Sequence, residues 1–313
     1  MELLVHGPRG NLKEWFCPFT DAIIAKLQAE GIKTDRYPVK RVNDANYQVI
    51  DLCDREVAVN INNMFVVNPK TDKYVLFTSF FDLRQFMGSS EIPQENLLKV
   101  FSGHYDKQII SRDCKAIEDK FSPWYFRPWQ DYRFYDYEWA PKNRNLFFRG
   151  LYIPKVREMV KYIHSKNQED LDVSVEPEDR QNFLIYHQSA LDSLVNLSVS
   201  GIRDMCHRDI ELWKMGCPFI KPRFTSELLI DIPDDVYFPV EWEVDRKFIT
   251  PIPVDAEKLA DDIVEKFNEV KDDKPLLEKT SDLGKKFWSD HFTLEKIVDN
   301  SFQLLISTGI LDE

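Results

Sequence analysis

The sequence lacks the features of secreted, membrane and nucleic-acid-binding proteins. No run of about eighteen apolar residues occurs, and residues 1–10 are too short and too soon interrupted for a signal peptide. The five cysteines are odd in number and stand without a C-x-x-C pair, which favours reduced thiols in a soluble, cytoplasmic protein. The net charge of -12 disfavours a broad electrostatic surface for nucleic acid or anionic membrane.

Several catalytic signatures are also missing. The chain has no G-x-S-x-G elbow, no P-loop and no H-E-x-x-H helix, which disfavours the common hydrolases. It has no G-x-G-x-x-G after a strand, so a nicotinamide cofactor is disfavoured. Adjacent aspartates occur as pairs rather than as D-x-D after an apolar strand. We therefore expect neither a metal nor a cofactor.

Two series of short apolar strands alternate with helical patterns. The first series has predicted strands at 2–6, 34–39, 57–61, 74–78 and 98–101 and a helix at 19–30. The second has strands at 146–148, 171–175, 194–199 and 219–220 and helices at 155–165, 178–193 and 256–270. This alternation predicts an α/β protein with two parallel, doubly wound sheets.

The domain organisation follows from the stretch between the two series. Residues 122–139 are rich in Trp, Tyr and Phe, and we interpret them as an interdomain crossing, with a platform for sugar rings as the alternative. We expect an N-terminal domain at 1–142 and a C-terminal domain at 143–288. The tail at 283–311 carries an apolar stripe typical of a helix.

The segment 198–222, SVSGIRDMCHRDIELWKMGCPFIKP, has the pattern of strand, glycine turn, helix and strand. Gly201 can take a positive φ, and the turn would direct unpaired N–H groups and the positive end of the helix dipole to one point. Arg203, His207 and Arg208 add donors there. The chemistry suits a diphosphate.

Other polar residues fall near the same strand ends. Glu211 lies one turn beyond Arg208, where it could accept hydrogen bonds from ribose hydroxyls. Arg149 and Lys221 follow predicted strands; Lys221 could hold sugar or phosphate oxygens or neutralise nearby carboxylates. The same spacing also fits a surface helix with ordinary ion pairs.

This segment, with its H-R-x-x-E helix start and the PIPVDAE stretch at 251–257, resembles the nucleotide-sugar half of a GT-B glycosyltransferase. The resemblance implies two Rossmann-like domains facing a cleft, with a last helix at about 289–313 packed back on the first. It places Glu211 on the ribose and Arg208, His207 and Arg149 on the pyrophosphate. The chain departs from the fuller E-x7-E pattern because Phe219 stands where the second glutamate would be.

The implied activity is transfer of a sugar from a nucleotide-diphosphate sugar to a hydroxyl of a glycan or other acceptor. Such a reaction can use a carboxylate or imidazole as base, and Asp82, His104 and His6 follow predicted strands of the first series. The loop with Gly7, Arg9 and Gly10 resembles the one that approaches donor and acceptor in the family. The alternatives are a non-catalytic protein that binds a nucleotide or phosphorylated metabolite, and a sugar-nucleotide epimerase.

Overall fold

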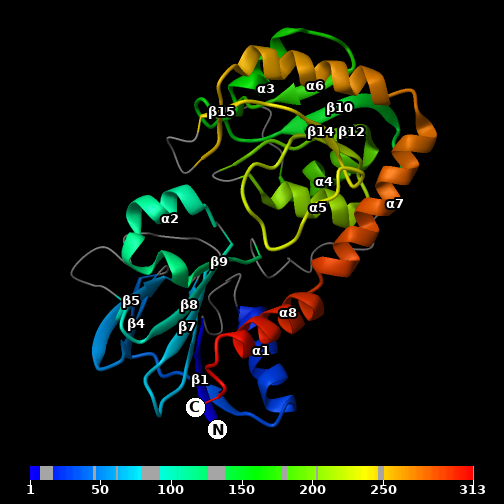
Figure 1. Cartoon of the computed structure of the whole chain (residues 1–313). Helices are drawn as coiled ribbons and strands as arrows, with labels where there is room; N and C mark the ends of the chain where they lie inside the picture. Colours follow the sequence, from blue (N-terminus) through cyan, green and yellow to red (C-terminus); the bar gives the residue numbers. More distant parts are fainter. Residues whose placement is uncertain are drawn as a thin grey trace. The chain divides into compact units, whose positions relative to one another are not determined.

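The computed structural model forms two compact units (Figure 1). Unit 1 comprises Met1–Asp131, Ser226–Ile230 and Phe292–Glu313, and unit 2 comprises Tyr132–Thr225 and Asp231–His291. The structure describes residues 1–7, 17–44, 47–60, 63–78, 92–103, 105–125, 138–177, 182–201, 204–245 and 250–312. None of the helices in these ranges is both long and apolar enough to cross a bilayer.

The main sheet of unit 1 is mixed, with strand order β2-β1-β6-β7-β8-β9. Its strands are β1 (Glu2–His6), β2 (Lys33–Arg36), β6 (Asn63–Val67), β7 (Tyr74–Thr78), β8 (Leu97–Ser102) and β9 (Phe121–Pro123). The prediction of a fully parallel sheet is wrong here, because β6 runs antiparallel to both β1 and β7. A connection as short as 68–73 between β6 and β7 can join only antiparallel strands.

A second, three-stranded antiparallel sheet forms from β3 (Arg41–Asp44), β4 (Tyr47–Leu52) and β5 (Arg55–Asn60). Cys53 and Asp54 join β4 to β5 with φ of 51° and 58°. A two-residue loop with both residues at positive φ matches the twist of a hairpin. The strand predicted at 57–61 therefore belongs to this hairpin and not to the main sheet.

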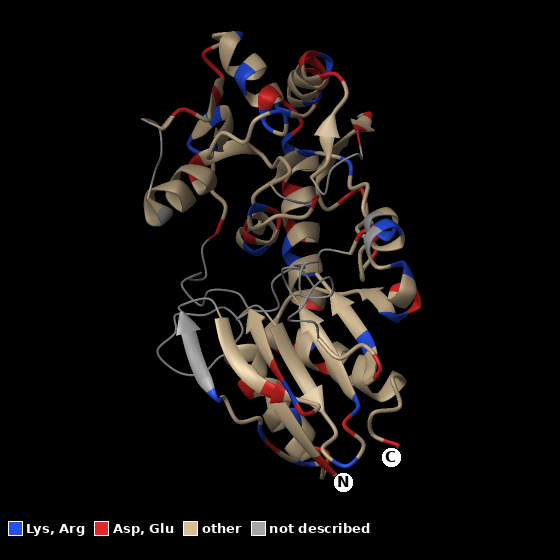
Figure 2. Ribbon diagram, turned by 90° about the vertical axis from the view of Figure 1, so that its left-hand side faces the viewer, with Lys and Arg blue, Asp and Glu red and all other residues tan. Residues whose placement is uncertain are grey.

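Helix α1 (Cys17–Ala29) and the last helix, α8 (Leu294–Ser307), pack against each other in unit 1. Lys26 on α1 pairs with Asp299 on α8 at 3.1 Å, and Trp124 Nε1 donates to Ser301 Oγ at 3.0 Å. The short helices α2 (Lys107–Asp113) and η2 (Lys115–Lys120) complete this unit's described helices. Figure 2 shows the main sheet mostly in tan, as expected of strands with buried apolar side chains.

The tail is two helices rather than one. Helix α7 (Lys274–His291) belongs to unit 2 and begins earlier than the predicted 283, whereas α8 belongs to unit 1. The break has a local cause, because the Thr293 side chain accepts a hydrogen bond from Lys296 N and so caps the start of α8.

The sheet of unit 2 is parallel, as predicted, with strand order β11-β10-β12-β13-β14. Its strands are β10 (Asn143–Arg149), β11 (Leu171–Ser174), β12 (Ser193–Leu197), β13 (Phe219–Pro222) and β14 (Phe238–Val240). A two-stranded antiparallel ribbon, β15 (Val244–Asp245) and β16 (Ile252–Pro253), follows. After β10, the chain adds β11 on one side of β10 and then β12 on the opposite side. The strand order therefore reverses between β10 and β12.

Helices cover both faces of this sheet (Figure 1). On one face α3 (Glu158–Ser165) and α6 (Ala256–Val270) contact each other over a core that includes Phe148, Leu197 and Ile220. On the other face, α5 (His207–Met215) packs against α7, and α4 (Phe183–Asp192) contacts β10 and β12. Helix α5 ends at Gly216, whose φ of 67° suits glycine.

Candidate anion site of unit 2

The loops that follow β10 and β12 emerge at the carboxyl edge of the unit 2 sheet. In open parallel sheets, ligands bind beyond this edge at the point where the strand order reverses. That point lies between β10 and β12. A ligand site is therefore expected at residues 149–157, 198–201 and 204–208.

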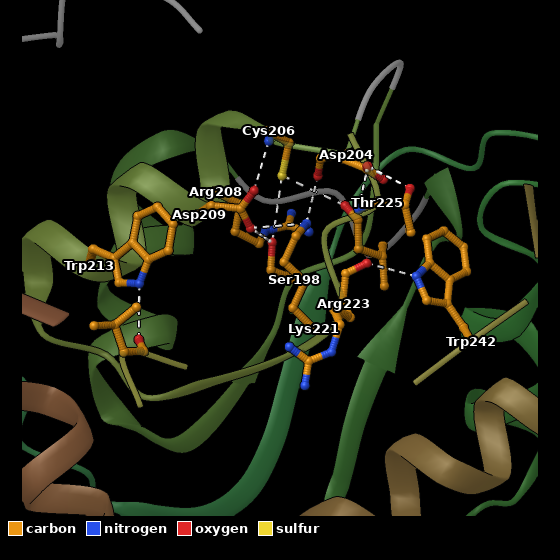
Figure 3. Close-up of polar contacts among 12 residues, drawn as sticks. Ser198, Asp204, Cys206, Arg208, Asp209, Trp213, Lys221, Arg223, Thr225 and Trp242 are labelled. Carbon is orange, nitrogen blue, oxygen red and sulfur yellow. Dashed lines mark hydrogen bonds and ion pairs between the residues drawn. The ribbon is translucent and has the colours of Figure 1, made fainter. Parts of the chain in front are cut away.

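Asp209 on α5 anchors the loop that follows β12 (Figure 3). Its carboxylate accepts hydrogen bonds from Cys206 N at 2.7 Å and from the Ser198 hydroxyl. The ammonium of Lys221, on β13, lies 3.2 Å from the same carboxylate. Asp209 thus closes a capping box at the start of α5 and ties that helix to two neighbouring strands.

Asp204 anchors the same loop from the other side. Its carboxylate accepts hydrogen bonds from Thr225 N at 2.8 Å and Thr225 Oγ1 at 2.7 Å, while its carbonyl accepts one from Lys221 Nζ at 2.7 Å (Figure 3). Hydrogen bonds between buried polar groups are strong in the low-dielectric interior and restrict the conformations of the loop that they join. The start of α5 is consequently held in a fixed position at the carboxyl edge of the sheet.

Arg208, the second residue of α5, is half-buried and held by three neighbours. Its Nε donates to the Tyr186 hydroxyl oxygen at 2.7 Å, its Nη2 donates to the carbonyl of Arg149, and its guanidinium carbon lies 4.0 Å from the centre of the Phe148 ring. Its Nη1 is buried and has no hydrogen-bond partner among the described residues. Burial lowers the pKa of Arg208, but Tyr186, Cys206 and the Glu211 carboxylate together raise it by more, so the guanidinium stays charged.

Arg157, just before α3, brings a second guanidinium to the same place. Its Nη1 donates to the carbonyl of Leu151 at 2.5 Å, and its guanidinium carbon lies 5.5 Å from the centre of the Phe148 ring. Its Nε is buried without a partner in the described part of the chain. Burial and the positive charge of Arg208 lower the pKa of Arg157 to about 10, so it is protonated at neutral pH.

Arg157 and Arg208 therefore share one aromatic ring and repel each other. Within the described ranges no carboxylate forms an ion pair with either. Buried cations are usually paired, and an unsatisfied buried donor costs about 1–3 kcal/mol. Two cationic groups that each have such a donor, placed side by side, are suited to binding an anion.

Gly150 makes this arrangement possible. A Cβ at this position would lie 2.9 Å from Arg157 Nη1 and 2.9 Å from a ring carbon of Phe148. Any side chain would displace the ring or the guanidinium, so the site requires a glycine here.

The structure places Arg149 differently from the prediction. Its guanidinium pairs with the Asp172 carboxylate and donates to the Asp172 carbonyl at 2.8 Å, so the side chain turns toward β11. Its contribution to the anion site is the carbonyl that holds Arg208. Sequence reasoning missed Arg157, which lies on the same loop; the only signal was a second arginine in the stretch RGLYIPKVRE.

Gly201 does not adopt the positive φ that the sequence suggested. Among the described residues, the neighbour of a Cβ at Gly201 would be Cys206 Cβ, at 3.9 Å. Lys221 is fully buried and contacts Asp204 and Asp209, which fits the alternative that it neutralises a carboxylate.

His207 and Glu211 lie four residues apart on α5. His207 is the first residue of the helix, and the Glu211 carboxylate lies one turn later, 3.6 Å from Nε2 of the buried His187 on α4. No described group of three or more His, Cys, Asp or Glu residues is arranged to hold a metal ion.

Two of the predicted residues in unit 1 are described. His6 ends β1 and is buried, with its ring centre 6.0 Å from that of Phe65. Gly7 follows it, and a Cβ there would lie 2.3 Å from Thr20 Oγ1, so glycine allows α1 to approach β1. The remaining predicted residues, Arg9, Gly10, Asp82, His104 and Arg203, lie outside the described residues.

No protein-family model matches the chain, and no curated protein matches it. Solved structures that are similar to the chain include the following two. One is a glycosyltransferase from Rickettsia africae ESF-5, with 13% identity and a TM-score of 0.41 over 67% of this chain and 63% of that one. The other is TarM, with 10% identity and a TM-score of 0.40 over 83% of this chain and 66% of that one. The chain spans less than two thirds of the length of either structure.

Proposed function

We propose that the protein is a glycosyltransferase whose unit 2 binds a nucleotide-diphosphate sugar, with the diphosphate at Arg157 and Arg208. One observation carries the proposal. Two guanidiniums that form no ion pair with a described carboxylate, each with a buried N–H group that lacks a partner among the described residues, meet at the strand-order reversal of a parallel sheet. A diphosphate supplies both the negative charge and the acceptor oxygens that these groups lack.

The chemistry of sugar transfer fits this site. As the glycosidic bond breaks, negative charge grows on the leaving diphosphate, and fixed cations stabilise it more in the transition state than in the ground state. Arg157 takes the phosphate-binding role that the family resemblance implies for Arg149, and Arg208 keeps the role that the resemblance implies for it. The N–H groups at the start of α5 add the positive end of a helix dipole. The reaction as proposed needs no metal.

The remaining roles complete the proposal. Glu211, held beside His187, accepts hydrogen bonds from the ribose, and His207 and Arg203 contact the donor near the diphosphate. Gly201 carries no side chain, so the ligand can approach its backbone closely. In the two-domain GT-B arrangement, unit 1 supplies the acceptor contacts and the base from among His6, Asp82 and His104.

A thermal-shift screen against UDP, GDP, ADP and CMP sugars tests the proposal. We expect one diphosphate sugar to raise the melting temperature of the wild-type protein, and Arg157→Ala and Arg208→Ala to lose most of that increase. Arg144→Ala is the matched control, because Arg144 lies on the same strand β10 but is exposed and pairs with Asp272. If no nucleotide stabilises the protein, or if all three variants respond like the wild type, the proposed site is wrong.

Catalysis requires a separate measurement. A glycosyltransferase slowly hydrolyses its donor when no acceptor is present, whereas a protein that only binds nucleotides does not. Release of free sugar from the stabilising donor, absent in Arg208→Ala, therefore separates these two functions. Conversion of the donor into an isomeric sugar nucleotide would instead indicate an epimerase.

A further inference from the structure

Tyr186 on α4 contacts Arg208 but has no role in the proposed reaction as described above. It is half-buried, and its ring centre lies 5.2 Å from the guanidinium carbon of Arg208 and 5.9 Å from the centre of the Phe147 ring. Helix α4 is fixed at its start, because the Asn182 side chain accepts a hydrogen bond from Ile185 N at 3.0 Å. The tyrosine is thus presented to Arg208 from a well-anchored helix.

The hydrogen bonds of Arg208 leave one nitrogen for a ligand. Nε is used by the Tyr186 hydroxyl oxygen and Nη2 by the carbonyl of Arg149, while Nη1 is buried without a partner among the described residues. The Phe148 ring blocks one face of the planar guanidinium. These contacts fix the direction of the Nη1 N–H groups.

Removing the phenol oxygen would change that direction. Nε would become a buried donor without a partner, and the guanidinium could rotate to regain one at the expense of Nη1. Burial also raises the pKa of Tyr186, which keeps the phenol neutral and so avoids a competing ion pair with Arg208.

We propose that Tyr186 is a positioning residue for anion binding: its hydroxyl oxygen holds Nε of Arg208 so that Nη1 faces the phosphate oxygens of the ligand. The inference rests on the proposed function, because it presupposes that Arg208 binds a phosphate. Tyr186 itself acts through Arg208 and not through contact with the phosphate. Its loss should therefore have no effect once Arg208 is absent.

A double-mutant cycle tests this dependence. The probe is inorganic pyrophosphate, and its Kd is measured by isothermal titration calorimetry for the wild type, Tyr186→Phe, Arg208→Ala and the double variant. We expect Tyr186→Phe to weaken binding about tenfold, since a hydrogen bond to a charged group is lost. In the Arg208→Ala background, Tyr186→Phe should change Kd by less than about twofold.

Two controls separate positioning from a general loss of structure. Tyr162→Phe removes a hydroxyl from an exposed tyrosine on α3 of the same unit and should leave the Kd unchanged. Arg208→Lys keeps the charge but lacks Nε, so Tyr186→Phe should again have no further effect in that background. A loss of folding would instead lower affinity in every background alike.

The outcomes distinguish the two proposals. If the wild type binds pyrophosphate and Tyr186→Phe binds it equally well, or if the effects of the two substitutions add, the positioning role is wrong and the proposed function stands. If Arg208→Ala binds pyrophosphate like the wild type, or if the wild type binds neither pyrophosphate nor any nucleotide of the screen, the proposed site fails and the role of Tyr186 fails with it.

Discussion

The ammonium of Lys221 lies 3.2 Å from a carboxylate oxygen of Asp209, and the two side chains are 1% and 0% exposed. This buried pair joins β13 to the first turn of α5, where Asp209 also accepts the Cys206 N–H. The start of α5, which presents Arg208, is therefore placed by a contact that no ligand can reach.

We expect Lys221→Met to destabilise the protein by about 3–5 kcal/mol, because it leaves the Asp209 carboxylate buried without its cation. Urea unfolding of the two proteins measures the difference. Combining it with Asp209→Asn removes the isolated charge but keeps an acceptor for Cys206 N, and should recover part of the loss. If the Lys221→Met protein instead keeps its stability but no longer binds nucleotide, Lys221 is a residue that binds the sugar donor.

Gly150→Ala should weaken nucleotide binding, because the new methyl group would lie 2.9 Å from both Arg157 Nη1 and the Phe148 ring. We expect a loss of affinity of tenfold or more, roughly the effect of losing one charged hydrogen bond. Gly201→Ala is the matched substitution, since among the described residues its methyl group would meet Cys206 Cβ at 3.9 Å, an ordinary contact distance. It should leave the melting temperature of the unliganded protein unchanged. Equal melting temperatures of the two unliganded variants would contradict the packing described for Gly150.

Arg157→Met should separate stability from binding. The substitution removes the repulsion between Arg157 and Arg208 and the buried Nε without a partner, so the unliganded protein should be at least as stable as the wild type. Stabilisation by the donor nucleotide should be lost. Urea unfolding with and without nucleotide measures both effects. A clear loss of stability without ligand would show that Arg157 supports the fold rather than a ligand.

Cys53, in the β4–β5 turn, should react slowly with iodoacetamide. Burial and the nearby Asp72 raise the pKa of its thiol to about 11, and only the thiolate reacts. At pH 8 we expect alkylation roughly a hundredfold slower than in urea, where the pKa returns to about 9, with the rate rising up to about pH 11. Mass spectrometry of the Cys53 peptide measures it. Because the pKa of Cys53 is higher in the folded than in the unfolded protein, its contribution to the free energy of unfolding is fully present below about pH 9. This contribution is lost as the pH rises through about 11.

Helix boundaries in unit 2 were predictable where the signals are local. Helix α6 spans Ala256–Val270 as predicted, because Asp255 accepts the Lys258 N–H at its start. The end of α5 followed from Gly216, the residue best suited to its φ of 67°. Such capping residues act within a few positions of themselves, so the sequence reveals them without knowledge of the fold.

The missed features depend on contacts between distant residues. All five residues of β6 are buried, so its sequence shows no alternation, and its direction is set by pairing with β1 and β7. Arg157 and Arg208 meet only because the β10 and β12 loops are neighbours in the sheet. Sequence spacing identified Arg208 as a candidate but could not show which arginine of the preceding loop would join it. The functional roles of both stay predictions.

Unit 1 is assembled from segments at both ends of the described chain, with α8 packed on α1. During synthesis, α1 leaves the ribosome early. The apolar surface of α1 that packs against α8 stays uncovered until α8 has been made. The strands of unit 2 are all made in between, so its sheet can form while unit 1 is still incomplete. A purified fragment that ends at residue 291 should therefore have a protease-resistant unit 2 and a protease-sensitive unit 1.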